Sequence, residues 1–97
     1  MTEVQVPERP KTAWIKMEDG SWQERTLYPR EEPVWWTTRN KYIKLNEMHF
    51  DHLTRALANE LGNRALGKRT GPRVDSWIEW LEYEIARRRA LADEFDV

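Results

Sequence analysis

The stretch Val34-Trp35-Trp36-Thr37-Thr38-Arg39-Asn40-Lys41-Tyr42-Ile43-Lys44-Leu45-Asn46-Glu47-Met48, followed shortly by His52-Leu53, decides the fold. Its first residues are β-branched or aromatic, which favours a strand. Asn40 tolerates the left-handed backbone region, so the chain can turn at 39–41. A second short apolar run follows the turn and passes directly into a helical pattern. The stretch therefore predicts a β-hairpin that leads straight into a helix.

A second hairpin is predicted upstream of this stretch. Residues 12–17 are a strand candidate, and 21–28 return after a turn in which Gly20 can take a positive φ. Residues 1–11 carry two prolines among charged side chains and are predicted to form an extended N-terminal arm. The remaining residues, 12–97, are predicted to form a single domain whose β-rich part is 12–45.

The first helix is expected over about 46–61, with Asn46 as its N-cap and Gly62 just past its end. Four apolar residues share one face of this helix at spacings of three and four and are expected to be buried. They are Phe50, Leu53, Leu57 and Leu61.

The second helix is expected over about 75–92. Its start is open between a capping box at Ser76 and a first helical position at Pro72. An apolar stripe identifies its core face: Val74, Trp77, Ile78, Leu81 and Ile85. Trp80 and Tyr83 lie off this stripe. The predicted fold class is α+β, with a small antiparallel β-sheet of two hairpins packed against a two-helix hairpin.

The size and composition of the chain exclude or disfavour several classes of function. The chain has 97 residues, six Trp and no Cys, which excludes disulfides and thiolate metal sites. Sixteen basic residues balance seventeen acidic ones, which disfavours a dedicated nucleic-acid coat or a polybasic membrane binder. No apolar run approaches the roughly 18 residues that a membrane span requires. The first residues do not look like a signal peptide, so a cytoplasmic location is expected.

The opening stretch resembles a pattern of small proteins encoded by bacteriophages and prophages. The shared features are Trp-Thr-Thr at 36–38, Ile-x-Leu at 43–45, Met48 and His52-Leu53. A weaker likeness lies at Leu81-x-x-Glu84-Ile85-x-x-Arg88. That family has no assigned activity, so the resemblance implies an origin rather than a reaction. If the chain is phage-encoded, it is expected in the host cell cytoplasm.

Catalysis and metal binding have little support in the sequence. His49 and His52 are three apart on a helix, but no third ligand stands at a metal-binding spacing. No nucleophile motif and no phosphate-binding glycine loop is present. The prediction is a non-enzymatic protein with no cofactor and no metal.

Two kinds of binding surface are predicted instead. Adjacent strand residues point to opposite faces, so one of Trp35 and Trp36 is expected in the core and the other at the surface. The alternative is a two-sided sheet that the N-terminal arm covers. Exposed aromatics in a small domain favour a protein interface. The interface candidates are Trp35, Trp36, Trp80, Tyr83 and Arg87.

The chain is therefore predicted to be a non-catalytic interaction protein, namely a phage-type modulator that binds a host or viral protein through these aromatics. Its partner could also be a second copy of the same chain, in a homodimer. One alternative is an accessory nucleic-acid-binding protein that uses the basic loop 62–73, because its cations could neutralise phosphates. The loop candidates are Arg64, Lys68, Arg69 and Arg73. The other alternative is a small virion or assembly protein.

Overall fold

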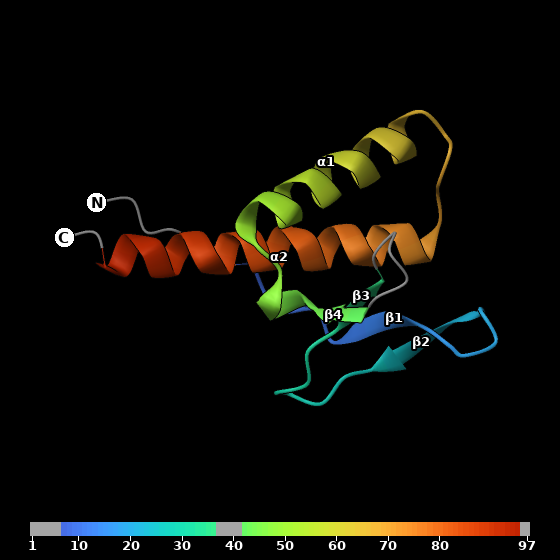
Figure 1. Cartoon of the computed structure of the whole chain (residues 1–97), viewed down its shortest axis with the longest axis horizontal. Helices are drawn as coiled ribbons and strands as arrows, with labels where there is room; N and C mark the ends of the chain where they lie inside the picture. Colours follow the sequence, from blue (N-terminus) through green and yellow to red (C-terminus); the bar gives the residue numbers. More distant parts are fainter. Residues whose placement is uncertain (1–6, 37–41, 96–97) are drawn as a thin grey trace.

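The computed structural model describes residues 7–36 and 42–95, apart from the side chains of residues 36 and 93–95. The chain forms four strands, a short 3-10 helix and two α-helices (Figure 1). The strands are β1 (Thr12–Lys16), β2 (Trp22–Thr26), β3 (Val34–Trp36) and β4 (Tyr42–Lys44). The helices are η1 (Leu45–Glu47), α1 (Phe50–Ala65) and α2 (Pro72–Phe95).

The predicted α+β architecture of two hairpins and a two-helix hairpin is confirmed. β1 pairs antiparallel with β2, with Thr12 opposite Thr26, and β3 pairs antiparallel with β4, with Val34 opposite Lys44. The hairpins form two separate two-stranded sheets, whereas the sequence predicted one sheet. Gly20 takes a φ of 87° in the first turn, as expected. The predicted turn at 39–41 lies outside the described residues.

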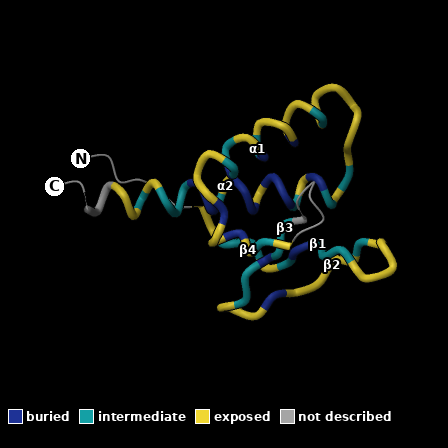
Figure 2. The backbone as a smooth tube through the Cα atoms, viewed as in Figure 1, coloured by how far each residue is buried: buried dark blue, intermediate teal, exposed yellow. Residues whose placement is uncertain are grey.

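Helix α2 is the central element of the molecule. In Figure 1, α1 crosses one side of α2, and the strands lie on its other side. Figure 2 shows that burial concentrates in the part of α2 between these two layers, and that the C-terminal part of α2 extends beyond them. Every apolar residue of the predicted α2 stripe is buried. The stripe therefore identified the core face of α2 correctly.

The helix boundaries differ from the predicted ones. Residues 45–47 form a 3-10 turn, Met48 is extended and buried, and α1 begins only at Phe50. The N-cap of α1 is His49, which makes no side-chain cap hydrogen bond, so the prediction of Asn46 as cap is wrong. Leu45 in the 3-10 turn and the extended Met48 both belong to the buried core, so the chain is anchored in the core before α1 begins.

The loop between the two helices is shorter than predicted, because α1 ends later and α2 begins earlier in the sequence. Gly62 is inside α1, which continues to Ala65, and Gly67 with a φ of 72° follows the helix end. α2 begins at Pro72, the alternative start, because the fixed φ of proline suits a first helical position. The capping box at Ser76 is therefore not formed, and α2 runs on to Phe95 instead of ending near residue 92.

The buried face of α1 is rotated from the predicted one. Of the four residues expected in the core only Leu53 is buried; Leu57 is half-buried, and Phe50 and Leu61 are 39% and 36% exposed. The other buried positions of α1 are Ala56 and Glu60. The small Ala56 side chain permits close packing of α1, and Glu60 is paired with Arg69 at 3.2 Å. Position 60 could not be recognised as buried because it carries a carboxylate.

Candidate interaction surface

Trp80 is not an exposed aromatic, so this prediction is wrong. Its side chain is only 1% exposed, and the indole Nε1 donates a hydrogen bond of 2.8 Å to the carbonyl oxygen of Thr12. On the same ring, the guanidinium of Arg9 lies 5.0 Å from the ring centroid. Trp80 lies off the apolar stripe, but β1 and the N-terminal arm cover the side of α2 that carries it. It is therefore part of the core.

The other aromatic candidates are partly covered. Trp35 is half-buried and packs edge-to-face on Trp77, with the ring centroids 4.9 Å apart. Tyr83 is half-buried beside Trp80, at a centroid distance of 6.0 Å. The side chain of Trp36 lies outside the described residues, so the predicted inside–outside division of the Trp35–Trp36 pair is not tested. Trp35, Trp80, Tyr83 and Arg87, the four interface candidates whose side chains the structure describes, thus form no exposed patch.

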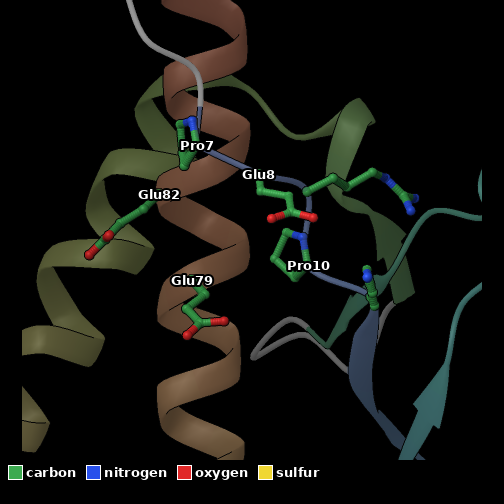
Figure 3. Close-up of a pocket in the computed structure, with 7 residues that line it drawn as sticks. Pro7, Glu8, Pro10, Glu79 and Glu82 are labelled. Atoms are coloured by element: carbon green, nitrogen blue, oxygen red, sulfur yellow. The ribbon is translucent and has the colours of Figure 1, made fainter.

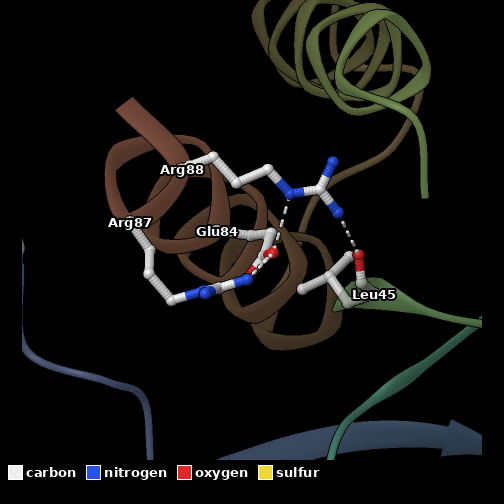
Figure 4. A network of polar contacts seen from close by, with 4 residues as sticks. All are labelled: Leu45, Glu84, Arg87 and Arg88. Carbon is white, nitrogen blue, oxygen red and sulfur yellow. Dashed lines mark hydrogen bonds and ion pairs between the residues drawn. The ribbon is translucent and has the colours of Figure 1, made fainter. Parts of the chain in front are cut away.

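Arg87, the fifth candidate, belongs to a polar network around Glu84. The Glu84 side chain is only 2% exposed and accepts hydrogen bonds from Arg87 at 2.6 and 3.0 Å and from Arg88 at 2.9 Å. Arg88 also donates to the carbonyl oxygen of Leu45 at 3.1 Å, which ties α2 to η1 (Figure 4). The hydrogen bond to Glu84 raises the pKa of Arg87. These arginines satisfy a buried carboxylate, which is a structural role.

The four cations of the predicted basic loop, of which Arg64 lies in α1 and Arg73 in α2, are mostly engaged within the chain. Arg64 pairs with Asp75 at 3.1 Å, and Arg69 pairs with the buried Glu60. The guanidinium of Arg73 lies 4.6 Å from the ring centroid of Trp22. Lys68 is exposed. The loop therefore presents much less uncompensated positive charge than its sequence indicates.

The two histidines lie on or beside α1, and the structure describes both of them. His49 is exposed and His52 is half-buried. Within residues 7–36 and 42–95, no group of three or more His, Asp or Glu side chains is placed to hold a metal ion.

A shallow pocket lies between the N-terminal arm and α2 (Figure 3). Residues 7–11 form one wall, and Glu79 and Glu82 of α2 form the other. The carboxylates of Glu8, Glu79 and Glu82 are exposed, as is Lys11. The lining of this pocket is therefore mainly charged and open to solvent.

A surface of uncharged side chains is uncovered on α1. Phe50, Leu57 and Leu61 lie on the side of this helix next to its buried face, and Thr54 follows them around the helix. Beyond Thr54 come small residues that are all exposed, namely Ala58, Gly62 and Ala65. A Cβ atom built at Gly62 meets no atom within 4 Å. We call these seven residues the α1 face; Asp51 is the one charged residue within the arc that they occupy.

The α1 face was not recognised in the sequence because its large residues were assigned to the core. The signal that could have revealed it is the width of the arc over which uncharged residues occur, with only Asp51, Glu60 and Arg64 as charged residues between them. At about 100° per residue, positions 50, 53, 54, 56, 57, 58, 61, 62 and 65 cover roughly half of the helix circumference or more. A single packing partner usually needs a stripe of about 100°. α2 covers only one side of this wide arc, and the other side remains open.

Comparisons with known proteins identified no similar protein. No protein-family model, no curated protein and no solved structure matches this chain. Among the described residues, neither helix combines the length and the apolar character that crossing a bilayer requires.

Proposed function

We propose that this chain is a non-catalytic interaction protein that binds another polypeptide through the α1 face. In its most concrete form it is a phage-type modulator that acts in the host cytoplasm, and its partner is a host or viral protein. The observation that carries the proposal is the α1 face, whose seven residues are uncharged and include Phe50 at 39% and Leu61 at 36% exposure. In this proposal the binding surface lies on α1, because Trp80 belongs to the core and Trp35 and Tyr83 are partly covered.

The chemistry of the α1 face supports protein binding. Contiguous apolar surface that is left open on a small domain usually marks a binding site. Small residues such as Ala58 and Gly62 allow another backbone to approach the helix closely. Helix-in-groove recognition uses apolar anchors at helical spacings, and Phe50, Leu57 and Leu61 have such spacings.

The nucleic-acid alternative has weaker support. Phosphate binding needs cations that are free to replace counterions. Arg64 and Arg69 are already paired with carboxylates, and Arg73 covers an indole ring. If the alternative holds, reversing the charge of Lys68 and Arg69 should abolish binding to DNA or RNA, and the binding should weaken steeply with salt.

A charge placed on the α1 face tests the proposal. Ala58→Arg puts a cation in the centre of the face, and Asn59→Arg adds the same charge at the next exposed position, which lies outside the face. We expect Ala58→Arg to reduce capture of partners from a lysate of the native host at least about tenfold, and Asn59→Arg to retain them. Circular dichroism should show that both variants fold. Equal capture by the two variants would contradict the proposal.

A further inference from the structure

We propose that the polypeptide bound by the α1 face is a second copy of this chain, with the two α1 helices packed side by side in parallel. The inference rests on the proposed function and specifies its partner. It follows from the sizes of the side chains on the α1 face, where a row of large residues (the ridge) runs beside a row of small ones (the groove), and from the charges at one end of the face.

The ridge consists of the large side chains Phe50, Leu57 and Leu61. It lies on the side of the face nearer to α2, because Arg89 of α2 lies 5.7 Å from the ring centroid of Phe50. The groove consists of Ala58, Gly62 and Ala65, on the side away from α2. Each ridge leucine immediately precedes a groove residue in the sequence, so Leu57 and Ala58, like Leu61 and Gly62, lie at nearly the same height.

Symmetry then selects a parallel pair. A two-fold axis that runs along two parallel helices places the ridge side of each helix against the groove side of the other. Leu57 of one copy would lie beside Ala58 of the second, and Leu61 beside Gly62. An antiparallel pair would instead place ridge against ridge and groove against groove, which leaves the small residues without packing partners. Well-packed contact requires a protrusion to meet a depression.

The charges at the N-terminal end of the face agree with this arrangement. Asp51 lies on the groove side, and Arg89 lies over Phe50 on the ridge side. Both are exposed, and within the described residues neither forms an ion pair in its own chain. The parallel pair brings Asp51 of each copy toward Arg89 of the other. Two opposite-charge pairs thus form by symmetry.

The first test measures the mass of the purified full chain by sedimentation over a concentration series. We expect the wild-type chain to reach twice 11.7 kDa and Ala58→Arg to stay at one chain mass, while Asn59→Arg dimerises like the wild type. Gly62→Leu is the sharper variant, because it fills the groove but makes the face more apolar. It should weaken dimerisation at least about tenfold, whereas non-specific hydrophobic association would become stronger. A wild-type chain that remains monomeric, or a tighter dimer with Gly62→Leu, overturns the proposal.

The second test uses the absence of native cysteine. In a parallel pair each face residue lies at the same height as its copy, and Ala58 and Ala65, near the middle of the face, lie close to the two-fold axis and therefore to their own copies. Single-cysteine variants Ala58→Cys and Ala65→Cys should therefore both cross-link on oxidation, and Asn59→Cys outside the face should not. In an antiparallel pair centred near Ala58, the two copies of residue 65 would lie about 21 Å apart. Cross-linking at 58 without cross-linking at 65 would overturn the parallel arrangement.

These results separate the inference from the proposed function. If the chain is monomeric and Ala58→Arg loses the captured partners, the proposal of a second copy is overturned and the proposal that the α1 face binds a partner is retained. A monomeric chain whose capture is unaffected by Ala58→Arg would overturn both. A charge swap adds an independent check: Asp51→Arg alone should weaken the dimer by about two- to tenfold, and Asp51→Arg with Arg89→Asp should restore it.

Discussion

The two helices of this protein have similar apolar content but different surroundings. α2 lies between α1 on one side and the strands on the other, so it is buried at its stripe and also at Trp80 and Glu84. α1 has a packing partner on one side only, and its buried residues are Leu53, Ala56 and Glu60. The comparison shows that the width of an apolar stripe indicates how much of a helix surface is suited to burial against other elements. Whether the rest of the same chain provides that cover depends on the position of the helix among the layers.

The largest expected effect tests whether α2 is buried beyond its stripe. Trp80→Ala should destabilise the fold by about 3–5 kcal/mol, because it removes a large buried side chain and its hydrogen bond to Thr12. Tyr28→Ala, at a residue that is 75% exposed, is the aromatic control and should change stability by about 0.5 kcal/mol or less. Urea unfolding measures both. If the two variants were equally stable, Trp80 would not be a core residue.

The next prediction compares two leucines of α1. Leu53→Ala should cost about 2–5 kcal/mol, since Leu53 is fully buried. Leu57→Ala should cost about half as much or less, because Leu57 is only half-buried in a single chain. The measurement is urea unfolding at low protein concentration, where dimerisation does not contribute. A larger loss at Leu57 would restore the α1 core face that the sequence predicted.

Buried carboxylates allow a similar comparison between the helices. Glu84→Gln on α2 should destabilise by about 1–3 kcal/mol, because Glu84 accepts charged hydrogen bonds from two arginines. Glu60→Gln on α1 should cost about 1 kcal/mol or less, since its partner Arg69 is mostly exposed. Thermal unfolding at neutral pH ranks the two variants. The reverse ranking would show that α1 depends on its ion pair more than α2 does.

The smallest effect concerns pH and the connector that packs near α2. Burial, and then the charge of Glu84, raise the pKa of Glu32 above its ordinary value of 4.5. The ionised form of Glu32 therefore destabilises the fold, and this cost grows as the pH rises through the raised pKa. Glu32→Gln should be slightly more stable than the wild type at neutral pH, and the difference should disappear below about pH 4.5. A pH-independent difference would rule out ionisation as its cause.

Most of the fold could be predicted from local patterns. The turn residues, the strand runs and the α2 stripe each reflect interactions between residues close in the sequence. The position of Trp80 could not be predicted this way, because its hydrogen-bond acceptor at Thr12 is 68 residues away. The start of α1 was missed for the same reason: Leu45 and Met48 are fixed by the core that forms around α2.

The candidate site was harder to predict than the fold. Aromatic residues off a stripe favour an interface in general, but in this small domain several of them complete the core. Phe50 and Leu61 were assigned to the core on their spacing, which does not reveal which side of a wide apolar arc the partner covers. The sequence indicated unpaired cations at Arg64 and Arg69. Their carboxylate partners, Asp75 and Glu60, lie outside the basic run and could not be recognised from it.

The edge-to-face pair of Trp35 and Trp77 has an optical consequence. The two indoles are 4.9 Å apart at an interplanar angle of 85°, and they join β3 to α2. Indole transitions at such a separation couple, so the pair should produce a circular dichroism signal that neither ring has alone. This signal reports docking of the second hairpin on the helix, separately from the helical signal itself. The protein thus contains an intrinsic, label-free reporter of the order in which its layers assemble.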